Sequence, residues 1–121
     1  MLPDKIEKFP ATLIVNTDPS SEPSEHWVVI HFDSKDNGEY FDSYGLPPLH
    51  QEIKLFMNKI CFMYGYNPVV LQCFECITCG QYCVLYVKYK YQGFKYCDFI
   101  SLFSNNQEKN NLIVKALVPV D

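Results

Sequence analysis

Three short runs rich in β-branched and aromatic residues lie in the first part of the chain, and they restrict the fold more than any other feature. These runs cover residues 11–17, 26–32 and 39–44. The first two are continuous apolar runs, as is typical of buried strands. A loop rich in proline and serine, residues 18–25, separates them, and Asp36-Asn37-Gly38 is a tight-turn signal before the third. The pattern predicts a sheet in which the second and third runs form a hairpin.

The remainder of the chain carries helical patterns and one further extended run. Residues 49–61 have apolar side chains at helical spacing, and the prolines just before them suit a first turn. Residues 68–72 are predicted to be a strand, and residues 105–118, which begin with asparagines, a helix. The run that starts at Cys79 allows a strand from its residue types and a helix from its length.

These elements together indicate an α+β fold. We expect a small mixed or antiparallel sheet that contains residues 11–17, 26–32, 39–44 and 68–72. A helix that starts at Cys79 is expected to pack on this sheet, in a three-layer-like arrangement. The chain has 121 residues, of which 48% are apolar, so we expect one domain that spans residues 1–121.

Charge and hydropathy argue against two classes of partner. The formal charge is −4, with lysine as the only strongly basic residue type, whereas proteins that bind duplex DNA usually carry a basic excess. No apolar run is long enough to cross a bilayer, and the first ten residues lack the apolar core of a signal peptide. Six cysteines in such a chain therefore indicate reduced thiols and an intracellular protein rather than a disulfide framework.

Four residues are candidates for chemistry, although each is a weak signal alone. Cys79 precedes a glycine and begins a potential helix, whose N-terminus would stabilise a thiolate. His26 follows a loop at a strand end and is a candidate base, ahead of His31 and His50. Asp42 is a carboxylate within an aromatic run and requires a partner if it is buried. Gln72 carries an amide that is able to donate to an oxyanion.

The predicted hairpin does not by itself bring His26 and Asp42 together. In a symmetric hairpin closed at Asp36-Asn37, the two residues are not opposite each other. Their contact requires a bulge, a long side-chain reach or a different turn register.

The order and spacing of these residues resemble the adenain family, the adenovirus-type maturation proteases, within the wider group that includes the SUMO-deconjugating cysteine proteases. The resemblance extends from about residue 11 to residue 83. It is carried by residues 14–17, His26-Trp27, residues 40–45, and Gln72 followed after six residues by Cys79-Gly80. The acidic residue is aspartate, as in the SUMO proteases, where the adenoviral members have glutamate. Relative to the family, the chain is reduced in size or truncated at both ends.

The resemblance implies a cysteine endopeptidase with a Cys-His-Asp triad. Cys79 would be the nucleophile, His26 the base, Asp42 the residue that orients His26, and Gln72 an oxyanion donor. It implies polypeptide substrates, such as structural precursors of viruses or mobile elements, an activating peptide, and a virion or host nuclear or cytoplasmic location. It implies no metal and no cofactor, and the acidic net charge argues against activation by DNA.

Two alternatives remain open from the sequence. Cys73, Cys76, Cys79 and Cys83 have the spacing of a ferredoxin half-motif, which would hold an iron-sulfur cluster or zinc. In that case Cys79 would be a ligand and would not be a free nucleophile. The other alternative is an inactive protease-fold remnant that serves as an interaction module.

Overall fold

The structure, a computed structural model, describes residues 2–17, 26–72 and 78–119. Within these residues three strands come first, one helix and a fourth strand follow, and three helices end the chain, which confirms the predicted α+β class. The elements are β1 (Ala11–Asn16), β2 (Trp27–Phe32), β3 (Asn37–Phe41), α1 (Gln51–Ile60), β4 (Met63–Tyr66), α2 (Cys79–Tyr91), α3 (Tyr96–Ile100) and α4 (Gln107–Leu117). None of the helices in these residues has the length and apolar character needed to cross a bilayer.

The four strands form one mixed sheet in the order β1-β2-β3-β4. β2 pairs antiparallel with β3, as the hairpin pattern predicts, and it also pairs antiparallel with β1, whereas β4 pairs parallel with β3. The parallel strand follows from α1, which carries the chain back across the sheet before β4 begins. β3 ends at Phe41, so Asp42 lies just beyond the sheet.

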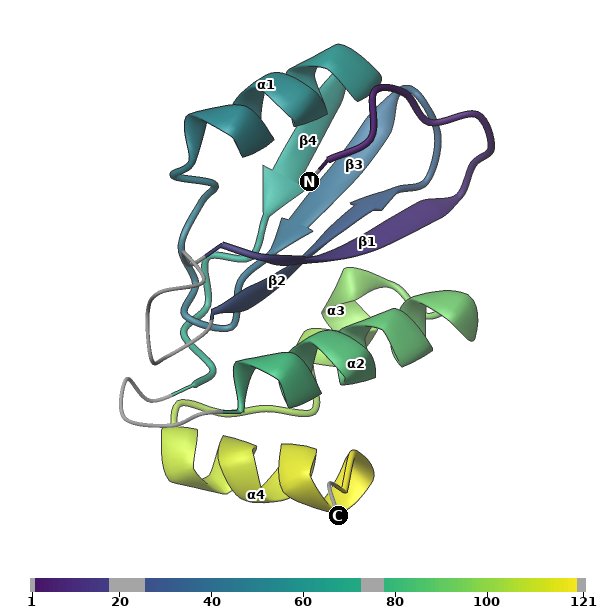
Figure 1. Cartoon of the computed structure of the whole chain (residues 1–121). Coiled ribbons are helices and arrows are strands. Elements are labelled where there is room, and N and C mark those ends of the chain that lie inside the picture. Colours follow the sequence, from purple (N-terminus) through teal and green to yellow (C-terminus); the bar gives the residue numbers. More distant parts are fainter. Residues whose placement is uncertain (1, 18–25, 73–77, 120–121) are drawn as a thin grey trace.

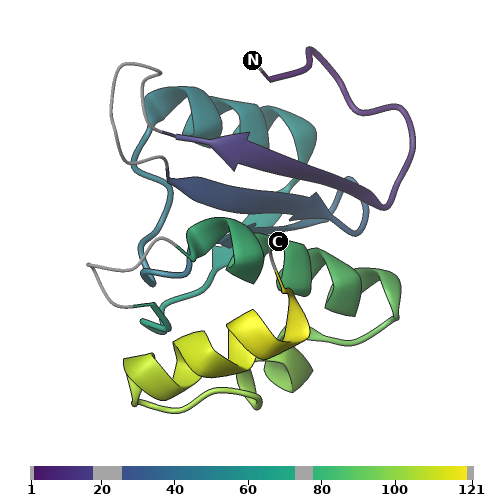
Figure 2. The same cartoon turned by 60° about the horizontal axis from the view of Figure 1, so that its bottom comes forward.

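Helices cover both faces of the sheet (Figure 1). α1 lies on one face, α2 and α3 lie on the other, and α4 packs beside α2 on the side away from the sheet (Figure 1, Figure 2). The alternation along β2 explains the two cores, because successive side chains point to opposite faces. Val28, Ile30 and Phe32 are buried with α1, and Val29 is buried with α2 and α4.

The sequence-based prediction of a strand at residues 68–72 is wrong. The fourth strand is β4, at Met63–Tyr66, and the chain turns away from the sheet after it. The side chain of Asn67 bonds to the backbone of Val69, and Pro68 has no N–H with which to continue a ladder. The N–H groups of Leu71 and Gln72 donate instead to the carbonyl of Ser43, 2.9 and 3.1 Å away.

The run that starts at Cys79 is a helix, α2, which resolves the ambiguity in its sequence pattern. Its buried side chains, which include Tyr82 and Tyr86, pack against Val29 and Phe41 of the sheet. The predicted helix at residues 105–118 is α4, and the Asn106 side chain accepts the Lys109 N–H at its start, 3.1 Å away. The short helix α3 was not predicted.

Candidate active site

The loop residue His26 lies immediately before β2, where the backbone N–H of Thr17 donates to its carbonyl at 2.8 Å. Its imidazole Nε2 lies 3.0 Å from Oδ1 of Asp42, and the side chain is 17% exposed. The ring stacks on Tyr44, with ring centroids 4.8 Å apart. His26 therefore lies between two residues of the segment that follows β3, with part of its ring accessible to solvent.

A tight turn after β3 holds the Asp42 carboxylate. Its Oδ1 accepts the backbone N–H of Tyr44 at 2.8 Å, and its carbonyl accepts the N–H of Gly45 at 2.8 Å. The turn explains how His26 and Asp42 meet, although the two residues are not opposite each other in a symmetric hairpin. β2 and β3 pair Val29 with Phe41, so the contact between His26 and Asp42 forms beyond the ends of both strands, where the chain is no longer pleated.

The nucleophile candidate Cys79 is the first residue of α2 and is buried, with 5% of its surface exposed. Burial raises the pKa of this thiol. The close contact with His26, the backbone N–H groups of Trp27 and Gly80, and the charge of His26 lower it, and the net result is a lowered pKa. The helix N-terminus and the imidazole therefore favour the thiolate.

The pKa of the His26 imidazole shifts in the opposite direction to that of Cys79. Burial lowers its pKa, but the close polar contacts with Asp42 and Cys79, together with the charges of both, raise it to about 9. A raised histidine pKa beside a lowered cysteine pKa favours the thiolate–imidazolium form of the pair over its neutral form.

The contacts of the His26 ring are close but not well aligned. Neither ring nitrogen makes a hydrogen bond of good geometry within the described part of the chain, so the 3.0 Å approach to Asp42 is an ion-pair contact. Such misalignment is common in active sites without substrate, where catalytic hydrogen bonds tighten only on binding.

The fourth candidate, Gln72, is fully buried and is connected to the same turn. The Ser43 hydroxyl donates to its Oε1 at 2.6 Å. The neighbouring Leu71 carbonyl accepts the hydroxyl of Tyr82 at 3.2 Å, and Tyr82 lies one turn into α2 from Cys79. The fold thus brings His26, Asp42 and Cys79 together and places Gln72 against the turn, next to Leu71, which contacts α2.

The other described cysteines lack these surroundings. Burial raises the pKa of both the Cys61 and the Cys83 thiols, and Cys97 is exposed. Cys73 and Cys76 lie outside the described residues, so the metal-site alternative stays a prediction. Within residues 2–17, 26–72 and 78–119, no three histidine, cysteine, aspartate or glutamate side chains are grouped as metal ligands would be.

The competing histidines have other surroundings. His31 is buried within β2, with Nδ1 2.8 Å from the Thr12 hydroxyl and Nε2 2.8 Å from Asp33. His50 is exposed just before α1. Within the described residues, His26 is the histidine that lies against a cysteine, Cys79.

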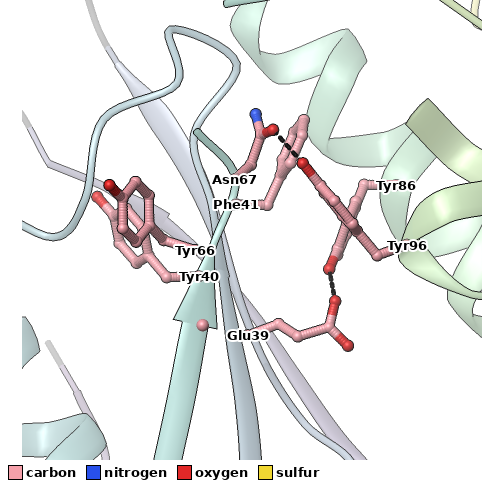
Figure 3. A pocket seen from close by; sticks show the side chains of 8 residues that line it. Glu39, Tyr40, Phe41, Tyr66, Asn67, Tyr86 and Tyr96 are labelled. Atoms are coloured by element: carbon pink, nitrogen blue, oxygen red, sulfur yellow. Dashed lines mark hydrogen bonds between the residues drawn. The ribbon is translucent and has the colours of Figure 1, made fainter. Parts of the chain in front are cut away.

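Asn67 was missed by the sequence analysis, although it supports the turn that carries Asp42. Its Nδ2 donates to the carbonyls of Asp42 and Val69, both at 2.9 Å, and its Oδ1 accepts the hydroxyl of Tyr96. Asn67 also lines a hollow of about 160 Å³ between the sheet and the helices (Figure 3). In this hollow the Glu39 carboxylate accepts hydrogen bonds from the Tyr86 hydroxyl and the Lys90 ammonium group. Glu39 therefore links β3 to α2. The Asn-Pro pair at this position is a turn signal that would have indicated Asn67.

Gly45 closes the turn and is expected to tolerate no side chain. Its φ is +76°, and a Cβ there would lie 2.9 Å from the carbonyl carbon of Val69. We predict that Gly45→Ala lowers the free energy of unfolding by roughly 2–4 kcal/mol, as left-handed strain and a backbone clash add. Gly93 is the matched control, with φ +88° but no atom within 4 Å, so Gly93→Ala is expected to cost only about 1 kcal/mol. Urea unfolding measures both, and equal losses would contradict the crowding at Gly45.

Comparisons with known proteins add little to this geometry. No family model and no curated protein matches the chain. Among solved structures, the chain is similar to the "Central domain of uncharacterized Lpg1148 protein from Legionella pneumophila", with a TM-score of 0.46 and 16% sequence identity. The alignment covers 88% of this chain and 65% of that one, slightly less than two thirds of its length.

Proposed function

We propose that this chain is a cysteine endopeptidase of the adenain-like type, with a triad of Cys79, His26 and Asp42. The observation that carries the proposal is the position of His26, between a buried carboxylate and a thiol at the N-terminus of α2. The opposite pKa shifts of His26 and Cys79 add to this support. An ordinary buried thiol, such as that of Cys83, has its pKa raised instead.

The proposed reaction is peptide-bond hydrolysis through a thioester. The Cys79 thiolate attacks the scissile carbonyl carbon, and Gln72 donates to the oxyanion that forms. The His26 imidazolium then protonates the leaving amine as the C–N bond breaks, which leaves an acyl group on Cys79. Neutral His26 next takes a proton from water, which attacks the thioester and releases the acid and the thiolate. Asp42 orients the ring and stabilises its charge.

The family resemblance supplies the more detailed part of the proposal. It favours an adenain-like arrangement of reduced size, in which the nucleophile helix packs on the sheet near His26. It also favours structural precursor polypeptides of viruses or mobile elements as substrates, with an activating peptide as a partner. α2 packed on β2, with Cys79 at its first position, is consistent with this arrangement.

A peptide library tests the activity without knowledge of the substrate. Proteome-derived peptides are incubated with the protein under reducing conditions, and new termini are identified by mass spectrometry. We expect new termini that share a sequence preference and that disappear after alkylation of Cys79. A library left intact, together with no acyl-enzyme on Cys79 from any peptide ester, would contradict the proposal.

A further inference from the structure

Ser43 connects the two halves of the proposed catalytic apparatus. It is 1% exposed and lies between Asp42 and Tyr44, both of which contact His26. Its hydroxyl donates to Oε1 of Gln72 at 2.6 Å, and its carbonyl accepts the backbone N–H of Gln72 at 3.1 Å. Both the backbone and the side chain of Gln72 are therefore held by one residue of the turn that carries Asp42.

The hydrogen bond to Oε1 determines which end of the amide faces away from Ser43. A glutamine amide has an acceptor oxygen and a donor nitrogen on opposite sides of a planar group, and the two ends exchange places when the group rotates by half a turn. Only the nitrogen end stabilises an oxyanion, because the oxygen end would repel it. With Oε1 held by Ser43, Nε2 points away from Ser43.

We propose that Ser43 is a positioning residue that fixes the Gln72 amide in the orientation that donates to the oxyanion. This inference rests on the proposed function, because it assigns Ser43 a role in the same reaction. It separates two properties of the site: His26 and Asp42 activate the thiolate, whereas Ser43 acts only on the step in which an oxyanion forms.

Two reactions of the same cysteine distinguish these properties. Iodoacetamide alkylates a thiolate by displacement of iodide, with no oxyanion in the transition state. Acetyl transfer from p-nitrophenyl acetate passes through a tetrahedral oxyanion, forms an acetyl thioester on Cys79 and releases p-nitrophenolate. Mass spectrometry of the Cys79 peptide follows both rates in the wild-type protein and in its variants.

We expect Ser43→Ala to lower the rate of Cys79 acetylation by about 10-fold to 100-fold while the rate of alkylation stays within about 2-fold. Gln72→Ala should lower acetylation at least as much, and Ser43→Ala should then cause no further loss in that background. Ser43→Cys keeps a donor, although a weaker one in a slightly larger side chain, and it keeps the inference testable if the alanine variant does not fold. Ser101→Ala, which removes an exposed hydroxyl, is the control.

The remaining outcomes overturn the inference in different ways. Equal losses in acetylation and alkylation would mean that Ser43 only supports the turn. Unchanged acetylation in both Ser43 variants would mean that it does not orient Gln72. If Cys79 of the wild-type protein is acetylated no faster than the exposed Cys97, the proposed function fails, and the inference about Ser43 fails with it.

Discussion

Cys79→Ala is expected to reduce peptide hydrolysis to the uncatalysed background, a loss of roughly 10⁴-fold to 10⁶-fold, because no other group replaces the nucleophile. The described cysteines offer no substitute. Burial raises the pKa of the thiol of Cys83, one turn along α2, and Cys97 is exposed away from any histidine contact in the described structure. The measurement is the initial rate on a cleaved peptide from the library, at equal concentrations of folded protein.

Cys97→Ala is the matched control for this variant, since it also removes one thiol from a helix. It should retain the full rate within about 2-fold, as is usual for an exposed substitution outside a site. A Cys79→Ala protein that still cleaves peptides would contradict the assignment of the nucleophile. A loss of hydrolysis in both variants would mean that the effect of Cys79→Ala is not specific to the proposed nucleophile.

Asp42→Asn is expected to lower hydrolysis by about 10²-fold to 10⁴-fold, with little change in size or shape at the site. The amide can retain its contact with the Tyr44 N–H, but it lacks the negative charge that stabilises the His26 imidazolium. Loss of that charge lowers the pKa of His26, and the weaker imidazolium in turn raises the pKa of Cys79. Steady-state kinetics should therefore show the loss mainly in kcat.

A second aspartate–histidine pair supplies the control for Asp42→Asn. Asp33 lies 2.8 Å from Nε2 of His31, and Nδ1 of the same ring lies 2.8 Å from the Thr12 hydroxyl. Asp33→Asn is expected to leave hydrolysis within about 2-fold of the wild-type rate. Similar losses in both variants would show that the effect is not specific to the triad.

The strands that surround the site could be predicted because their local patterns agree with their pairing. β1 and β2 match the predicted runs closely. The chain returns at residues 33–36, slightly before the predicted turn, because Asn37 and Gly38 already belong to β3 and Gly38 pairs with Phe32. The strand at residues 68–72 was mispredicted because its apolar residues satisfy the same pattern. Its pairing is prevented by Asn67 and Pro68, whose effect depends on the tertiary contacts of the turn.

The site residues could be named from the sequence, but their geometry could not. A symmetric hairpin keeps His26 and Asp42 apart, and their contact depends on a turn stabilised from outside by Asn67. Ser43 and Tyr44 were missed for the same reason, since their roles arise from contacts between segments about 20 to 30 residues apart in the chain. The direction of each pKa shift likewise required the position of Cys79 at the N-terminus of α2.

The central claim is that Cys79 and His26 form a thiolate–imidazolium pair, and the pH dependence of Cys79 alkylation tests it most directly. Brief iodoacetamide treatment of the wild-type protein and of His26→Ala, followed by mass spectrometry, gives the rate at Cys79 for each pH. In the wild type the thiolate should already react below the pKa of an ordinary thiol, about 8.5. In His26→Ala the midpoint should move upward, because burial then acts without the opposing imidazolium charge. If the two proteins have the same midpoint, Cys79 is not paired with His26 and the account is wrong.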